Sequence, residues 1–163
     1  MIRISVLLAL VAVPVCAQNL TFDPSLTENC MVASSDSFAM QGCIGKSATH
    51  CSLETPEGIS TAVMQSCFEL EMSYWDQRLN DSYQRFMSGL KLEDENNPFP
   101  GKSPKSPALL QMQRSWITFR DAKCEFADVL WGRNNAGALA RAHCLMTETA
   151  MQTIHLETSE TGR

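Results

Sequence analysis

Cysteines constrain this chain more than any other residue type. Seven occur in 163 residues, and six follow the N-terminal segment: Cys30, Cys43, Cys51, Cys67, Cys124 and Cys144. Their spacings contain no Cys-x-x-Cys pair, so they fit neither a zinc site nor a thioredoxin-type redox motif. An even number of cysteines in an exported chain is typical of a disulfide framework. The sequence therefore predicts a small domain held together by three disulfides.

The N-terminus has the three parts of a secretory signal peptide. Arg3 supplies a positive charge, residues 4–15 are almost entirely apolar, and Val15 and Ala17 suit a cleavage site. The apolar run is too short to span a bilayer. We therefore expect cleavage after Ala17, no transmembrane segment, and a periplasmic or secreted protein. The alternative is a lipid-modified Cys16, which requires a small residue before the cysteine, and Val15 fits that requirement poorly.

The charge of the chain restricts its partners. The full chain has 13 Lys and Arg against 18 Asp and Glu, and removal of Arg3 with the signal leaves a net charge of −6. Residues 18–163 form one domain of ordinary size, large enough to bury a core. No basic patch is visible, which argues against nucleic acid or an anionic membrane surface as a partner. An acidic protein is better suited to bind a cationic one.

Apolar residues recur at helical spacing in three stretches, whereas β-branched clusters are few. The three stripes are Phe68, Met72, Trp75, Leu79, Tyr83, Phe86 and Leu90; Leu109, Met112, Trp116, Phe119, Phe126 and Leu130, with a gap at Lys123; and Leu139, Ala142, Met146, Ala150 and Ile154. Segments rich in Pro, Gly and Asn separate them. We expect an all-α bundle of about five helices, over residues 25–34, 37–50, 59–92, 106–131 and 137–157.

The helix map also predicts which cysteines pair. Two antiparallel helices meet level at residues that are equidistant from the connecting turn. The midpoints of Cys30–Cys43, Cys51–Cys67 and Cys124–Cys144 fall at the expected turns near 36, 59 and 134. The competing pair Cys43–Cys51 would span eight residues of one expected helix, about 12 Å, against an upper limit of about 7 Å between the Cα atoms of a disulfide.

No motif indicates an enzyme. The three histidines belong to no metal-binding or triad-like pattern, and the methionines sit on apolar faces as core residues. The acidic run Glu93, Asp94 and Glu95 stands at a helix end beside a Pro-rich segment, where a solvated turn is the simplest interpretation. We expect no catalytic residue, no metal ligand set and no cofactor.

Two runs predict a polar clamp between helices. If the helices on either side of residue 98 form an antiparallel hairpin, Asp76 faces Arg120 and Asn80 faces residue 116. Asp121 follows Arg120, and Trp75 and Trp116 flank the pair. We expect Asp76 and Arg120 to form a buried ion pair that fixes the register of the helices rather than one that performs chemistry.

These runs resemble a known family. Residues 75–83 contain Leu-Asn-x-x-Tyr, residues 111–124 contain Gln-Arg-x-Trp-x-x-Phe-Arg-Asp-Ala-x-Cys, and Cys-Leu follows at 144. Their succession resembles the LprI-like family, a bacterial envelope domain named for a mycobacterial lipoprotein that inhibits lysozyme. The resemblance implies a non-enzymatic, disulfide-bonded helical domain over residues 51–157. Residues 18–50 would then be an N-terminal helical extension and residues 158–163 a frayed tail.

Two functions remain open from the sequence. The first is an inhibitor of a cationic lysozyme, for which Glu93, Asp94 and Glu95 are candidate contacts because a mobile carboxylate could enter the sugar-binding cleft. The second is a structural or assembly module that binds another envelope protein or peptidoglycan through a helix face. The resemblance supplies no contact motif that would decide between them.

Overall fold

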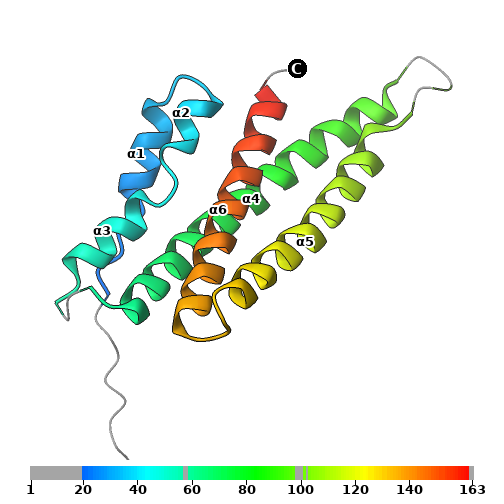
Figure 1. Ribbon diagram of the computed structural model, residues 1–163. Coiled ribbons are helices and arrows are strands. Elements are labelled where there is room, and N and C mark those ends of the chain that lie inside the picture. Colours follow the sequence, from blue (N-terminus) through cyan, green and yellow to red (C-terminus); the bar gives the residue numbers. More distant parts are fainter. Residues whose placement is uncertain (1–19, 57–58, 98–100, 102, 162–163) are drawn as a thin grey trace, which may run out of the picture.

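The computed structural model describes residues 20–56, 59–97, 101 and 103–161, and over these residues the regular structure is entirely helical. The helices are α1 (Ser25–Ala33), α2 (Ser37–Gln41), α3 (Lys46–Glu54), α4 (Thr61–Glu95), α5 (Lys105–Leu130) and α6 (Asn135–Thr161). Figure 1 shows the three long helices together, with α1, α2 and α3 as a smaller group on one side. The predicted all-α fold is confirmed. The predicted signal peptide lies outside the described residues.

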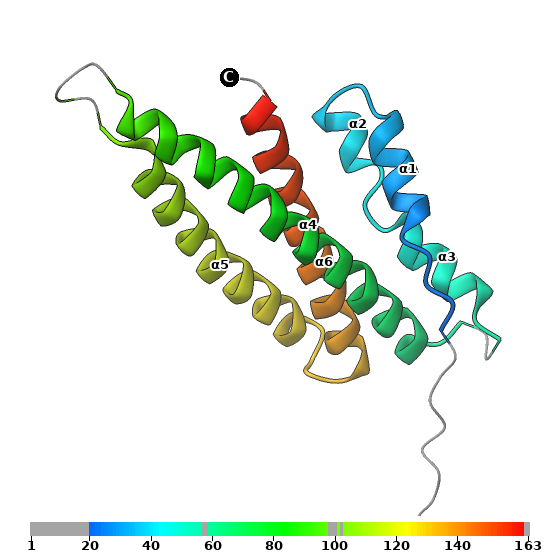
Figure 2. The ribbon, with the colours of Figure 1, turned by 180° about the vertical axis from the view of Figure 1, so that it is seen from behind.

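α6 is the central helix of the bundle. It packs along α4 and against α5, whereas α4 and α5 contact each other much less. Figure 2 shows α4 and α5 joined at one end, with α6 behind them. Because α6 bridges the two helices, they do not form the closely packed hairpin that the sequence suggested. The group of short helices attaches mainly through α3 on α4 and α2 on α6.

Local polar contacts explain where several helices begin. The Asp36 side chain accepts a hydrogen bond from the Ala39 amide at the start of α2, and Ser60 accepts one from the Val63 amide at the start of α4. Both are N-caps, which satisfy amides that have no partner inside the helix. α5 is capped from a distance instead, because the amides of Lys105 and Ser106 both donate to the Asp94 carboxylate at 2.8 Å.

The expectation of one helix over residues 37–50 is wrong. The chain leaves α2 at Gln41 and enters α3 at Lys46, with Gly45 in the left-handed conformation at φ +86°. Glycine adopts that conformation without the steric penalty that a Cβ atom brings. The sequence signal for this break was the pair of glycines at 42 and 45, which the helix prediction for residues 37–50 ignored.

The expected frayed tail is helical over residues 158–161, and its last two residues lie outside the described part of the chain. α6 continues through Thr161, and the Thr158 hydroxyl donates to the carbonyl of Ile154 at 2.8 Å. The helix continues because Leu156 is fully buried and Glu157 binds α4, so the last turns have tertiary partners.

Two apolar clusters form the core. The larger one surrounds Trp75 and joins the short helices to the bundle; its buried members are Met31, Cys43, Ala48, Cys51, Val63, Cys67, Trp75, Met146, Ala150 and Ile154. The smaller one lies toward the connection between α4 and α5 and consists of Leu79, Phe86, Met87, Leu90, Leu109 and Leu156. Burial of such side chains contributes about 1.5–3 kcal/mol each relative to exposure.

The three predicted disulfides are confirmed. Cys30–Cys43, Cys51–Cys67 and Cys124–Cys144 have Cα–Cα distances of 5.6, 5.8 and 5.4 Å. The first joins α1 to the segment after α2, the second joins α3 to α4, and the third joins α5 to α6. The last two disulfides therefore tie two helices across the segment that connects them, whereas the first ties α1 to the segment between α2 and α3.

Candidate functional site

A buried carboxylate organises the contact between the short helices and α4. Glu71 is fully buried and accepts four hydrogen bonds, from the Thr27 hydroxyl, the Gly45 amide, the Ala48 amide and the Trp75 indole, at 2.7–3.1 Å. Two of these donors belong to the start of α3, where amides lack partners and negative charge is favoured. Four internal donors and complete burial leave the carboxylate little capacity for a further partner, so Glu71 is a structural residue.

The polar bridge between long helices joins α4 to α6. The Arg78 guanidinium donates to both carboxylate oxygens of Glu157, at 2.8 and 3.1 Å, and the Ser82 hydroxyl donates to the same carboxylate at 3.1 Å. Burial lowers the pKa of Arg78, but the hydrogen bond and charge of Glu157 more than offset it and leave the pKa raised. Burial also raises the pKa of the neighbouring Tyr74. No sequence pattern singled out this bridge, because its partners are far apart in the chain.

The predicted clamp residues come together, but not as an ion pair. Asp76, Asn80 and Arg120 line one hollow on the α4–α5 side of the molecule. Within it Asn80 donates to Asp76 at 3.1 Å, while Arg120 pairs with Asp121 at 2.8 Å and stacks on Trp116 at 4.9 Å. The predicted buried pair between Asp76 and Arg120 is therefore wrong. The predicted alignment of the two helices does bring Asp76 and Arg120 into one hollow. However, α4 and α5 each pack mainly on α6 and contact each other much less.

This hollow is a concave surface lined by residues from two of the runs that resemble the family, 75–83 and 111–124. Its volume is about 580 Å³, and a second depression of about 360 Å³ adjoins it through Met72, Ser73 and Leu145. We call the two together the acidic hollow, because Glu69, Asp76 and Asp81 line it and no ion pair within the described residues engages these three. Arg120 and Arg141 also line these depressions, but they pair with Asp121 and Glu125, so the lining remains negative overall and its concave shape focuses that potential.

The charge of the mature chain is unevenly divided. Residues 98–145 contain seven basic and three acidic residues, whereas the remainder of the chain after residue 17 contains five basic and fifteen acidic. The negative potential therefore arises from α1 to α4 and the end of α6 rather than from α5. A cationic partner would be attracted to the α4 side, where the acidic hollow lies.

The acidic run at the end of α4 has structural partners. Asp94 caps α5, and the backbone hydrogen bonds from Lys105 and Ser106 lower its pKa. Glu93 pairs with the Lys105 ammonium at 2.6 Å. Glu95 is exposed, so it is the member of the run that is best placed to meet a partner.

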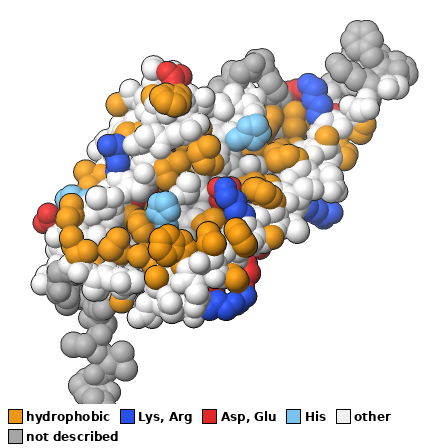
Figure 3. Space-filling model, in the orientation of Figure 1, with side chains coloured by type: hydrophobic (Ala, Val, Ile, Leu, Met, Phe, Trp, Pro, Cys, Tyr) orange, Lys and Arg blue, Asp and Glu red, His pale blue; other side chains and the backbone are white. Residues whose placement is uncertain are grey.

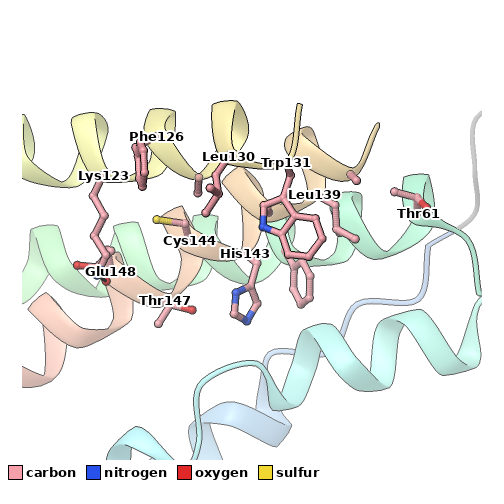
Figure 4. Close-up of a pocket in the computed structure, with 14 residues that line it drawn as sticks. Thr61, Lys123, Phe126, Leu130, Trp131, Leu139, His143, Cys144, Thr147 and Glu148 are labelled. Carbon is pink, nitrogen blue, oxygen red and sulfur yellow. Dashed lines mark hydrogen bonds and ion pairs between the residues drawn. The ribbon is translucent and has the colours of Figure 1, made fainter. Parts of the chain in front are cut away.

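A second concave surface is apolar. A groove of about 670 Å³ lies between α5 and α6 and reaches the start of α4; we call it the apolar groove. Figure 3 shows hydrophobic side chains gathered on this face, and Figure 4 shows Phe126, Leu130 and Trp131 extending from the end of α5 beside His143 and Leu139 of α6. Cys144 also lines the groove, and Phe68 contacts the His143 ring at 5.0 Å.

The groove corrects the prediction that the second apolar stripe is a core face throughout. Leu109, Met112 and Trp116 do pack in the smaller cluster, but Phe119, Phe126 and Leu130 are 57%, 64% and 68% exposed. The gap at Lys123 interrupts the stripe, but exposure already begins at Phe119, so the sequence did not mark where the stripe leaves the core.

Neither concave surface has a composition suited to a metal ion. Within the described residues, no three His, Cys, Asp or Glu side chains lie close enough to hold one. None of the described helices is long and apolar enough to cross a membrane.

Comparison with known proteins gives one match. The family model described as Lysozyme inhibitor LprI matches residues 51–156, which include α4, α5, most of α6 and both concave surfaces. No curated protein and no solved structure matches the chain. The family match confirms the resemblance seen in the runs around Trp75, Trp116 and Cys144.

Proposed function

Because the chain belongs to the LprI lysozyme inhibitor family, we propose that it acts outside the cytoplasm by binding a lysozyme and blocking its activity. Three disulfides indicate an extracytoplasmic protein, since such bonds persist in oxidising compartments. The periplasm or the secreted fraction, reached after cleavage at Ala17, is the proposed location. The family match is the single observation that carries the inhibitory role.

The acidic hollow is the proposed contact surface. Glu69 and Asp76 stand seven residues apart on α4 and therefore share one helix face, and Asp81 continues the same surface. No ion pair among the described residues neutralises them, so they are available to the Arg and Lys side chains of a cationic enzyme. Charge-assisted hydrogen bonds from Arg to carboxylate are roughly twice as strong as neutral ones.

Electrostatic attraction between the two proteins would mainly raise the rate at which they associate. Complementary charge steers two proteins together and raises the association rate, an effect that salt screens beyond about 8 Å at physiological ionic strength. Inhibition should therefore weaken as salt rises. The enzyme's sugar-binding cleft would be covered by the α4 side of this protein rather than filled by the end of α4, where Asp94 and Glu93 already have partners.

A charge-matched pair of variants tests the contact surface. The double variant Asp76→Asn, Asp81→Asn removes two charges from the hollow, and Asp23→Asn, Glu54→Gln removes two exposed charges from the short-helix side. We expect the first to raise the inhibition constant against a cationic lysozyme about tenfold and the second to change it less than about twofold. Turbidity assays on cell-wall suspensions measure both.

Other outcomes are equally informative. Equal effects of the two double variants would show that only net charge matters and would overturn the hollow as the contact. A loss of inhibition in Glu95→Gln alone would move the contact to the end of α4. No inhibition by the wild type would exclude the tested lysozyme. Specific capture of an envelope protein by that same inactive wild type would then favour the assembly-module hypothesis.

A further inference from the structure

We propose that the apolar groove is a self-association surface, through which two copies of this chain pack α5 against α5 about a twofold axis. This interaction is independent of the proposed lysozyme contact. It accounts for a surface that the inhibitory role leaves unexplained.

The exposed apolar surface at the end of α5 is comparable in area to the largest patch of a typical monomer, a patch that is often functional. Phe119, Phe126, Leu130 and Trp131 are 57–68% exposed; the last three line the groove at the end of α5, and Phe119 lies about two turns before Phe126 on the same helix face. Because a buried aromatic side chain covers about 150–250 Å², these four expose on the order of 500 Å². The largest apolar patch on a typical monomer is about 300–600 Å² and often functional. Water contact over such a surface is unfavourable, so a partner is expected.

The area fits a second copy. Two such patches facing each other would bury on the order of 1,000 Å² before the surrounding polar rim is counted, and specific interfaces begin at about 1,200 Å². A symmetric dimer uses the same patch twice, which requires a surface that fits itself. Here Phe126 lies between Phe119 and Trp131 along α5, so a twofold axis near Phe126 places the protruding Phe119 of one copy near the groove of the other.

The charges around the groove favour a second copy over the other occupants. Lys123 and Glu148 are the two charged residues that line it, and they pair with each other at 2.7 Å. Beside it, Arg133 pairs with Glu125 and approaches Asp128, and Arg141 also approaches Glu125, so two cations meet two anions. The groove is therefore locally neutral. Neither a cationic enzyme nor an anionic membrane gains attraction there, whereas two identical neutral surfaces meet without repulsion.

Dimerisation would leave the acidic hollow open. In α6, Leu139, His143 and Thr147 line the groove, whereas Ala138, Arg141 and Leu145 line the hollow. At 3.6 residues per turn these two sets lie on opposite faces of the helix. A dimer formed through the groove thus presents two acidic hollows outward, one from each copy.

The test is the mass of the mature protein in solution across a wide range of concentration. Sedimentation velocity or light scattering should show the mass doubling between low micromolar and several hundred micromolar protein. Phe126→Ser should raise the dimer dissociation constant at least about tenfold, because central aromatic residues dominate interface energies. Phe38→Ser is the matched control, since Phe38 is 84% exposed on α2, outside the groove, and the dimer should be unchanged.

Three results would overturn the proposal. One is a single-chain mass over the whole range. The second is a dimer that Phe126→Ser leaves intact. The third is a wild-type protein that stays a single chain but loses lysozyme inhibition or vesicle binding when Phe126 is replaced by Ser. The groove would then bind the enzyme or a lipid surface. Helical circular dichroism and intact disulfides confirm that each variant is folded. Retained inhibition by a monomeric Phe126→Ser protein would support self-association as a separate property.

Discussion

α4 and α5 carry apolar stripes of similar spacing, yet the structure treats them differently. In α4, Trp75, Leu79, Phe86 and Leu90 are all buried, because α6 covers the stripe and the short helices cover its first half. In α5 only Leu109 and Cys124 are buried, and the stripe beyond Trp116 remains exposed. An apolar stripe therefore predicts that a helix has a binding face. It does not predict whether the partner belongs to the same chain.

The acidic residues of α4 differ from one another in the same way. On α4, Glu71 is enclosed and accepts four hydrogen bonds, while Asp76 and Asp81, little more than one and nearly three turns later, line an open hollow. The same side-chain chemistry thus serves architecture at one position and is available for recognition at another. Burial and the number of internal donors distinguish the two.

The largest effect is expected at Glu71. Glu71→Ala removes the acceptor of four buried donors and should lower the free energy of unfolding by about 3–5 kcal/mol. Urea denaturation of the oxidised protein measures this loss. Glu69→Ala is the control on the same helix and should cost no more than about 0.5 kcal/mol, because Glu69 is exposed. Equal losses would show that water replaces the carboxylate in the Glu71 variant.

Truncation of one phenylalanine on each helix sharpens the comparison of α4 with α5. Phe86→Ala should cost about 3–4 kcal/mol, since Phe86 is buried in the smaller cluster. Phe126→Ala should cost less than about 1 kcal/mol at concentrations where the protein is a single chain, because most of that ring is already in water. Thermal or urea unfolding measures both. A large cost at Phe126 would mean that the groove is part of the core.

Substitution of two arginines compares the observed bridge between Arg78 and Glu157 with the predicted clamp at Arg120, which does not form. Arg78→Ala removes a bidentate, partly buried pair with Glu157 and should cost about 1–2 kcal/mol. Arg120→Ala removes a pair with the exposed Asp121 and should cost about 0.5 kcal/mol or less. A double-mutant cycle on Arg78 and Glu157 measures the coupling. A larger loss for Arg120 would revive its role in fixing the helix register.

The smallest effect concerns acid stability at the start of α5. The pKa of Asp94 is lowered below its usual 3.8 in the folded protein. Its contribution to stability is therefore fully present above that value and is lost as pH falls through the lower, folded pKa. The protection of the Lys105 and Ser106 amides against hydrogen exchange should fall only below pH 3.8, while the Met64 amide, which donates to the Ser60 carbonyl, serves as the reference. Uniform acceleration at all three amides would indicate global acid unfolding.

The sequence by itself determined the features that depend on neighbours along the chain. The three disulfides, the all-α fold and the three long helices followed from cysteine positions around turns and from the 3.6-residue repeat. Each disulfide bridges two segments that are close in the sequence, so symmetry about the turn was sufficient. The break between α2 and α3 was missed, although Gly42 and Gly45 are a local signal for it.

Only the tertiary structure decided the rest. The sequence suggested that α4 and α5 pack as a hairpin, whereas the structure shows that α6 bridges them. With α6 in this position, Arg120 pairs with Asp121 and Arg78 pairs with Glu157. The acidic hollow is open to solvent, and Phe126 is mostly exposed. The physical reason is that helix packing depends on how whole faces fit in three dimensions, and residues 79 positions apart carry no local signal that they will meet.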